Sequence, residues 1–231
     1  MKKILVTGGA GFIGYNIASL LSLYPDNHVY VLDDLSKGGM DREFERLTRR
    51  DNVTFYHMDM TEQRTYGRIE PEFDQVYHLA AVVGVGNVMS RPDLTLRVNT
   101  LSTIYLLEYM KKMKNRPRIL FTSSCENYAG SVSRGIASVP TPEDVPLCIE
   151  DVTNPRWTYA ATKILGEMAC MQYAEKYGFE AVIARYHNVY GPRMGTQHVI
   201  PAFITRLSLD PDKLEMFGGY QYRTFCYVTD A

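Results

Sequence analysis

Three glycines at regular spacing follow the first short apolar run of the sequence. The segment TGGAGFIG contains Gly8, Gly11 and Gly14, and Phe12 and Ile13 open the stretch that follows the turn. Glycine permits a tight turn and lets the backbone approach another group closely. The first amides of a helix that begins there attract phosphate groups. The spacing predicts a pyrophosphate-binding turn, with a plain glycine-rich turn as the alternative.

An acidic residue follows this turn at an informative distance. Asp33 ends the next apolar run, nineteen residues after Gly14, close to the roughly twenty that separate a dinucleotide-binding turn from its ribose-binding acid. A carboxylate there accepts hydrogen bonds from a ribose diol and repels a 2′-phosphate. The pair of signals therefore predicts NAD, not NADP, as the cofactor. Asp34 is the competing candidate for the ribose-binding acid. Its alternative role is to cap a helix or to remain solvated.

A tyrosine and a lysine later in the chain could move a proton. Tyr159 and Lys163 in YAATK lie four residues apart, so a helix places them on one face. A free tyrosine has a pKa near 10, but a nearby ammonium, helped by a positively charged nicotinamide, favours the phenolate. We therefore expect Tyr159 to act as a base. A tyrosine and a lysine four residues apart also occur by chance. The spacing therefore counts as evidence for a proton-transfer pair only if the fold binds a dinucleotide.

The elements that must position these residues alternate between short apolar runs and helical patterns. Runs of this length, bounded by turn signals, are typical of strands buried on both faces. The predicted strands are Ile4 to Thr7, His28 to Leu32, Val53 to His57, Gln75 to Leu79, Arg118 to Thr122 and Glu180 to Arg185, and the predicted helices are Phe12 to Leu23, Leu94 to Lys114, Pro155 to Tyr177 and Val199 to Leu209.

Strand–helix alternation predicts an α/β fold, a doubly wound parallel sheet of the Rossmann type. Two segments break the alternation. The proline-containing segment Ala129 to Asn154 is predicted to be a long loop, and Asn188 to Thr196 a second loop. Long loops in compact domains tend to be functional or disordered.

Composition excludes several classes of partner. The 231 residues carry a net charge of −1, with 45% hydrophobic and 22% charged residues, which fits an ordinary globular protein. Nothing suggests a nucleic-acid surface, and no apolar run has the length of a membrane helix. The four cysteines lack paired spacing. We expect reduced thiols in a cytoplasmic protein, with neither disulfides nor a metal site.

Several motifs occur together in an order that resembles the extended short-chain dehydrogenases. They are TGGAGFIG, HLAA (His78 to Ala81), TSSCENY (Thr122 to Tyr128), YAATK and RYHNVYGPR (Arg185 to Arg193). That family contains NAD-dependent nucleotide-sugar epimerases, 4,6-dehydratases and decarboxylases. The resemblance spans Met1 to Asp230 and implies a nucleotide-sugar substrate linked to UDP, dTDP, GDP or CDP.

The resemblance also implies roles for individual residues. Ser124 matches the residue that hydrogen-bonds the reacting hydroxyl, Tyr159 the catalytic base, and Lys163 the residue that binds the nicotinamide ribose and lowers the tyrosine pKa. Further matches on the cofactor side are Asp59, Met60, Leu79, Ala80, Ala81 and Asn99. Matches on the substrate side are Asn188, Arg193 and Arg223, although Thr224 replaces the aspartate that usually follows the arginine.

Two residues after Ser124 bear on which sugar chemistry occurs. Glu126 matches a glutamate that dehydratases and decarboxylases share, where it is assigned as a catalytic base. Cys125 occupies the position of the dehydratase acid, and a thiol is a weaker general acid there. This weakens the dehydratase interpretation. Glu126 could instead orient a neighbouring loop, and Cys125 could be a small buried hydrophobic residue.

The expected reaction is a transient oxidation of the sugar at C4, in which tightly bound NAD takes a hydride and later returns it. The main prediction is an epimerase/dehydratase, with a decarboxylase or 4,6-dehydratase as the alternative. A catalytically silent NAD-binding protein and an oxidoreductase that consumes NAD are alternatives of other classes. They predict NAD binding without turnover and accumulation of NADH, respectively.

Two domains are predicted. Residues 1–185 form the NAD-binding domain, and 186–231 form the beginning of a smaller substrate-binding lobe, truncated by comparison with family members. Family members are often dimers that pack two helices across a two-fold axis. Here the resemblance implies a homodimer through Leu94 to Lys114 and Pro155 to Tyr177.

Overall fold

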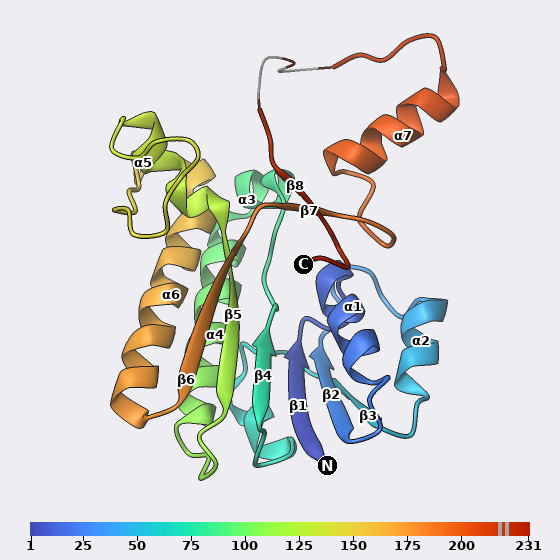
Figure 1. Ribbon diagram of the computed structural model, residues 1–231, viewed down its shortest axis with the longest axis vertical. Helices are drawn as coiled ribbons and strands as arrows, with labels where there is room; N and C mark the ends of the chain where they lie inside the picture. Colours follow the sequence, from blue (N-terminus) through green and yellow to red (C-terminus); the bar gives the residue numbers. More distant parts are fainter. Residues whose placement is uncertain (217–218, 220–221) are drawn as a thin grey trace. The chain divides into compact units, whose positions relative to one another are not determined.

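Six strands form one sheet in the order β3-β2-β1-β4-β5-β6 in the computed structural model, which describes residues 1–216, 219 and 222–231. β1 pairs in parallel with β2 and β4, β2 with β3, and β4 with β5. The bounds are β1 (Lys2–Thr7), β2 (Asn27–Asp33), β3 (Val53–His57), β4 (Gln75–His78), β5 (Arg118–Ser124) and β6 (Glu180–Tyr186). This order has its switch point between β1 and β4 (Figure 1), which confirms the predicted doubly wound fold.

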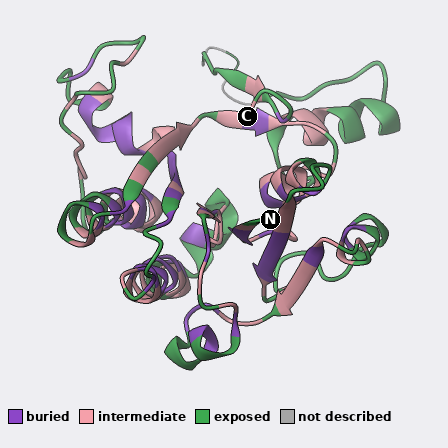
Figure 2. Cartoon of the chain, turned by 60° about the horizontal axis from the view of Figure 1, so that its bottom comes forward, coloured by how far each residue is buried: buried purple, intermediate pink, exposed green. Residues whose placement is uncertain are grey.

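Helices cover both faces of this sheet because successive strand residues point to opposite faces. Ile4 and Val6 of β1 pack with α1 (Phe12–Leu21) and α2 (Arg42–Thr48), whereas Leu5 belongs to the core formed with α4 (Pro92–Met110) and α6 (Thr158–Tyr177). Figure 2 shows the resulting band of buried residues along the strands and on the inward sides of the helices.

Short helical segments join these elements. They are α3 (Val85–Ser90), α5 (Ala129–Ser133) and the 3-10 helices Gln63–Arg68, Cys125–Tyr128 and Pro155–Trp157. The prediction of a loop from Ala129 onward is wrong for its first five residues, which form α5. A Cβ on Gly130 would lie 2.1 Å from the carbonyl oxygen of Cys148. The segment around Cys148 thus packs closely against α5. A contact between residues this far apart in the sequence cannot be predicted from the local pattern.

The chain divides into two compact units, Met1–Arg185 and Tyr186–Ala231. In the second unit, β7 (Asn188–Tyr190) pairs in parallel with β8 (Phe225–Tyr227), and α7 spans Val199–Leu209 as predicted. The prediction of a loop over Asn188 to Thr196 is wrong at its first three residues. Their hydrogen-bonding partner is far away in the sequence, so a local pattern could not reveal the strand.

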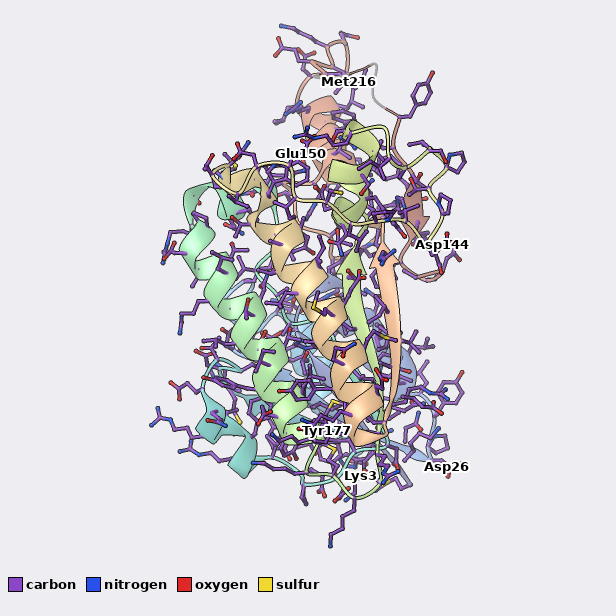
Figure 3. The ribbon with its side chains drawn as sticks, turned by 90° about the vertical axis from the view of Figure 1, so that its left-hand side faces the viewer. Lys3, Asp26, Asp144, Glu150, Tyr177 and Met216 are labelled. Atoms are coloured by element: carbon purple, nitrogen blue, oxygen red, sulfur yellow. The ribbon has the colours of Figure 1, made fainter. Side chains whose placement is uncertain are left out.

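In Figure 3, α4 and α6 run side by side along the first unit. Tyr177, the last residue of α6, lies at the same end as Lys3 of β1, and Glu150 lies at the opposite end. The first turn of α6, which contains Tyr159, is therefore close to the carboxyl edge of the sheet, where parallel α/β folds bind ligands. Within the described residues, no helix has the length and apolarity needed to cross a membrane.

Candidate active site

The turn between β1 and α1 leaves no room for side chains at two of its glycines. Gly8 has φ +67°, and a Cβ there would lie 2.7 Å from the amide nitrogen of Ala80. A Cβ on Gly14 would lie 2.2 Å from the carbonyl oxygen of Gly8. Gly11 is the N-cap of α1 and has no side chain that could cap it, so the first amides of the helix remain without a partner inside the helix. The arrangement fits a ligand such as a pyrophosphate, which is bound by backbone amides.

Sequence reasoning missed one glycine of the turn. A Cβ on Gly9 would lie 2.4 Å from Cγ1 of Val31 on the neighbouring strand β2. Gly9 therefore lets the turn pack against the sheet. The sequence does contain the signal, since Gly9 follows Gly8, but its partner on β2 is visible only in the fold.

The two candidate acids after β2 have different surroundings. Asp33 accepts hydrogen bonds from the amides of Ala10 at 3.0 Å and Leu35 at 2.8 Å, which attach its carboxylate to the glycine turn. Burial raises the pKa of Asp33, and these two amides oppose the increase. Asp34 is exposed and accepts hydrogen bonds from Ser36. The geometry favours Asp33 as the acid beside a bound ribose.

A buried histidine joins the ends of β1 and β4. His78 Nδ1 lies 2.8 Å from Oγ1 of Thr7, and its Nε2 lies 3.0 Å from Oγ1 of Thr103 on α4. Thr7 Oγ1 also accepts the amides of Leu79 at 3.2 Å and Ala80 at 3.3 Å. Burial, and then the charge of Lys163, lowers the pKa of His78 to about 3. A neutral histidine thus holds the Leu79–Ala81 segment against the glycine turn.

Three other residues predicted to bind the cofactor lie in contrasting environments. Asp59, which follows β3, accepts the amide of Thr61 at 2.7 Å, and Met60 is buried. Asn99 on α4 is buried, accepts the amide of Val82 at 2.7 Å and donates to Oγ1 of Thr162 at 3.2 Å. Asn99 therefore ties the segment after β4 to α6. Its assignment to the cofactor remains a prediction.

The proposed proton-transfer residues meet where β5 ends and α6 begins. Tyr159 lies in the first turn of α6, and its phenol is close to the side chain of Ser124, the last residue of β5. Lys163, four residues further along α6, is buried and donates to the carbonyl oxygen of Thr122 at 2.7 Å. The Lys163 Nζ atom lies 5.7 Å from the centre of the Tyr159 ring. The structure therefore brings Ser124, Tyr159 and Lys163 together, as the sequence motifs predict.

The electrostatics of this group differ from the expectation. Burial raises the pKa of Tyr159, and the hydrogen bond with Ser124 offsets only part of the increase. Burial also lowers the pKa of Lys163 to about 8. In the protein alone the net pKa of Tyr159 is therefore raised, because removal from water disfavours the phenolate just as it disfavours the ammonium of Lys163.

Glu126 and Cys125 lie in the 3-10 helix Cys125–Tyr128, directly after Ser124. The amide of Glu126 donates to Ser124 Oγ at 3.2 Å, and its carboxylate accepts a hydrogen bond from Arg156 at 2.6 Å. Sequence reasoning missed Arg156, which lies three residues before Tyr159 in PRWTY. The only hint in the sequence was the position of Arg156 just before Tyr159, close to the predicted catalytic residues. Glu126 is thus a half-buried, ion-paired carboxylate next to the proton-transfer residues.

The residues predicted to bind substrate belong to the second unit. Asn188 begins β7 and donates from its side chain to the carbonyl oxygen of Thr224 at 2.9 Å. Arg223 is exposed and precedes β8, and Arg193 follows β7 with φ +70°. The β7–β8 pairing therefore brings Asn188 near the Arg223 segment. The roles of all three remain predictions.

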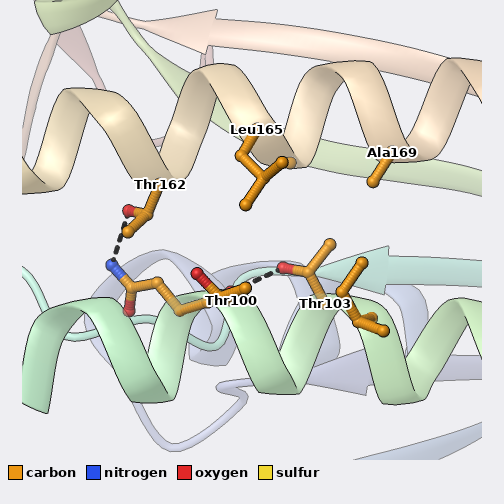
Figure 4. Close-up of a pocket in the computed structure, with 8 residues that line it drawn as sticks. Thr100, Thr103, Thr162, Leu165 and Ala169 are labelled. Atoms are coloured by element: carbon orange, nitrogen blue, oxygen red, sulfur yellow. Dashed lines mark hydrogen bonds between the residues drawn. The ribbon is translucent and has the colours of Figure 1, made fainter.

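A small depression with no room for a water molecule lies between α4 and α6 (Figure 4). Its lining includes Thr100, Thr103, Thr162, Leu165 and Ala169, and the Asn99–Thr162 hydrogen bond crosses it. The lining contains neither Tyr159 nor a glycine of the turn. This depression is therefore separate from the proton-transfer group.

Known proteins resemble this chain over its whole length. It is 33% identical to the UDP-N-acetyl-alpha-D-glucosaminuronate decarboxylase of Bacillus cytotoxicus, with 100% of this chain and 68% of that protein covered. It is 31% identical to the dTDP-D-glucose 4,6-dehydratase of Homo sapiens, with 100% of this chain and 63% of that protein covered. A crystal structure of a UDP-galactose 4-epimerase matches with a TM-score of 0.79 at 32% identity, over 99% of this chain and 68% of that one.

These relatives carry out three different reactions, and the chain spans roughly two thirds of their length. The structural match shows that the epimerase shares the fold of this chain. The model of the NAD dependent epimerase/dehydratase family matches residues 4–231, and the chain belongs to this family.

Proposed function

We propose that this chain is the catalytic part of an NAD-dependent epimerase/dehydratase that oxidises C4 of a nucleotide-bound sugar transiently. The observation that supports the proposal is the grouping of Ser124, at the end of β5, with Tyr159 and Lys163, which lie one helical turn apart on α6. This group lies after β5, and the glycine turn lies after β1. Both therefore belong to the carboxyl edge of the same parallel sheet.

The glycine turn and the amides of Phe12, Ile13 and Gly14 would bind the pyrophosphate of NAD, and Asp33 would bind its adenosine ribose. This assignment rests on a backbone that tolerates no Cβ at Gly8 or Gly14. It also rests on a carboxylate fixed against the turn. When bound, NAD accepts the hydride from the sugar carbon and returns it later. Its positive ring also supplies charge that favours the Tyr159 phenolate.

The chain's own residues would handle the protons. Tyr159 removes the proton of the sugar hydroxyl, and the Ser124 hydroxyl beside it forms a hydrogen bond with that sugar oxygen. Lys163 places a cation close to the phenol. The 4-keto sugar has an acidic neighbouring C–H, and Glu126 is the nearby carboxylate that would remove such a proton.

A decarboxylase is the second candidate, and Cys125 favours it over a 4,6-dehydratase. Dehydration needs a general acid for the departing hydroxyl, and a thiol is a weaker acid than a carboxyl group. A 4-keto sugar acid loses CO2 without such an acid. The resemblance to a curated decarboxylase agrees with this candidate.

The test is incubation of the purified protein with NAD and a panel of UDP-, dTDP-, GDP- and CDP-sugars, followed by mass spectrometry and NMR. Unchanged mass with new ring couplings identifies an epimerase, loss of CO2 a decarboxylase, and loss of water a dehydratase. In each case Tyr159→Phe should retain NAD binding and lose roughly 100-fold or more in kcat.

Two outcomes would contradict the proposal. NAD binding without conversion of any sugar indicates a catalytically silent protein. Accumulation of NADH in proportion to product indicates an oxidoreductase that consumes NAD.

A further inference from the structure

One face of α6 contacts three consecutive residues at the end of β5. Tyr159, Lys163 and Glu167 follow one another at four-residue intervals, so they share this face. Tyr159 lies beside Ser124, Lys163 donates to the carbonyl oxygen of Thr122, and Glu167 accepts from the hydroxyl of Ser123. Glu167 thus extends the row that begins with the proton-transfer residues.

Glu167 is held on its other side by an arginine from β6. Arg185 donates from Nε to Oε1 of Glu167 at 2.9 Å and from Nη2 to Oε2 at 2.7 Å, a bidentate ion pair. The side-chain Nδ2 of Asn127 donates to the same Oε1 atom at 2.8 Å. Glu167 is only 8% exposed and Asn127 is fully buried. The carboxylate is thus enclosed and bound by three side-chain partners, Arg185, Ser123 and Asn127.

Arg185 also reaches the end of the 3-10 helix Cys125–Tyr128. Its Nη1 donates to the hydroxyl of Tyr128 and to the carbonyl oxygen of Glu143, each at 2.9 Å. The guanidinium lies 4.9 Å from the centre of the Tyr128 ring. The ion pair therefore contacts the segment at Asn127 and Tyr128, directly after Cys125 and Glu126.

The electrostatics indicate that both charges persist in the folded protein. Burial raises the pKa of Glu167, but hydrogen bonds from Arg185 and Ser123 outweigh it, and the net change is a lowered pKa. The hydrogen bond with Glu167 raises the pKa of Arg185. Removing one partner would leave the other charged and poorly solvated.

We propose that Glu167 and Arg185 are positioning residues that fix the Cys125–Tyr128 segment relative to Tyr159. This rests on the proposed function, in which Ser124, Glu126 and Tyr159 surround the reacting sugar. A four-residue 3-10 helix has little stability of its own. Its cap is Ser124 Oγ, which also contacts Tyr159, so a displaced segment would disturb the proton-transfer geometry.

The test compares Glu167→Gln and Arg185→Lys with a matched control, Glu180→Gln. Glu180 forms an exposed ion pair with Arg118, and this pair joins the first residue of β6 to the first residue of β5. Ser124 is the last residue of β5, and Arg185 lies near the end of β6. The control therefore breaks an ion pair between the same strands, away from the segment. Arg185→Lys keeps the positive charge but loses the planar guanidinium that binds the carboxylate with two hydrogen bonds. It therefore tests the same ion pair if Glu167→Gln does not fold.

The first measurement is hydrogen exchange of the amides of residues 125–128, with and without NAD. We expect faster exchange at residues 125–128 in Glu167→Gln and Arg185→Lys, with little change in the strands of the sheet. Glu180→Gln should exchange at the wild-type rate. The second is steady-state kinetics with whichever nucleotide-sugar the wild type converts. We expect kcat to fall on the order of 10- to 100-fold while KM and NAD affinity change little, because misplaced groups lower the rate of chemistry.

The proposal is wrong if exchange at residues 125–128 matches the wild type. It is equally wrong if the variants accelerate exchange across the whole sheet, which would indicate a purely structural role. If the wild type converts no sugar, the proposed function fails, and the exchange result still decides whether the pair holds the segment.

Discussion

Tyr159 and Lys163 show how burial sets the chemistry of single residues. Both side chains leave water at the junction of β5 and α6, where Tyr159 lies beside Ser124 and Lys163 donates a hydrogen bond to the carbonyl oxygen of Thr122. Burial disfavours the charged form of each, so the pKa of the tyrosine rises and that of the lysine falls. The phenol is therefore neutral in the protein alone, and its ionisation requires added positive charge.

The lowered pKa of Lys163 predicts a pH-dependent stability. Its pKa is about 8 when folded and about 10.5 when unfolded, so between these values the unfolded chain binds more protons. Stability therefore rises with pH across this window. Relative to Lys163→Met, the free energy of unfolding of the wild type should increase by up to about 3 kcal/mol between pH 7 and roughly pH 10.5.

Urea denaturation of both proteins at several pH values measures this difference, and groups common to both cancel. A difference that stays constant with pH would show that Lys163 is solvated in the folded state.

At the scale of elements, close backbone approaches position the site. The β1–α1 turn touches the end of β4 through Gly8 and Ala80, and it touches β2 through Gly9 and Val31. His78 and Thr7 link the same strand ends by hydrogen bonds. On the other side of the switch point, one face of α6 is fixed to the end of β5. The two halves of the candidate site are thus held by neighbouring strands of one sheet.

Gly14→Ala tests the turn. The added Cβ would lie 2.2 Å from the carbonyl oxygen of Gly8 and 2.8 Å from Cα of Gly9, and backbone atoms cannot move aside without shifting α1. We expect NAD affinity to fall by about tenfold or more, with a loss of stability of about 1–3 kcal/mol. Calorimetric titration with NAD and thermal unfolding measure both.

Gly86→Ala in α3 is the control, because its added Cβ meets nothing within 4 Å. NAD binding by Gly14→Ala at wild-type affinity would exclude the turn as the pyrophosphate site.

At the scale of the whole molecule, the fold leaves part of its helical layer uncovered. Leu96 on α4 and Leu165, Met168 and Met171 on α6 are each at least 43% exposed. They lie on the two helices through which the family resemblance implies a homodimer. An apolar face on the proposed interface helices agrees with that prediction.

A charge on this face should therefore separate the subunits. We expect Met168→Glu, at a position that is 59% exposed, to convert a dimer to a monomer without loss of NAD binding. Leu20→Glu on α1 is the control, since Leu20 is 55% exposed on the opposite helical layer. Light scattering after size-exclusion chromatography measures the mass of each. A monomeric wild type would refute the predicted interface.

The sequence by itself determined the six strands of the sheet, the flanking helices α1, α4 and α6, and the family, but it did not reveal α2. Strands buried on both faces are typically short and apolar, the glycine turn has a fixed place in a doubly wound fold, and the order of the motifs identified the family. Asp33 was preferred over Asp34 from spacing, and the geometry agrees because Asp33 binds the amide of Ala10. These features depend on local patterns, which a single chain displays.

Only the tertiary structure revealed the contacts between distant residues. Arg156 beside Glu126, Arg185 beside Glu167, and the pairing of β7 with β8 join positions 18 to 37 residues apart. The direction of the Tyr159 pKa shift also depended on burial, which spacing does not report. Ion pairs, strand pairing and desolvation arise from proximity in space, so the motifs could name the reacting residues but not the groups that hold them.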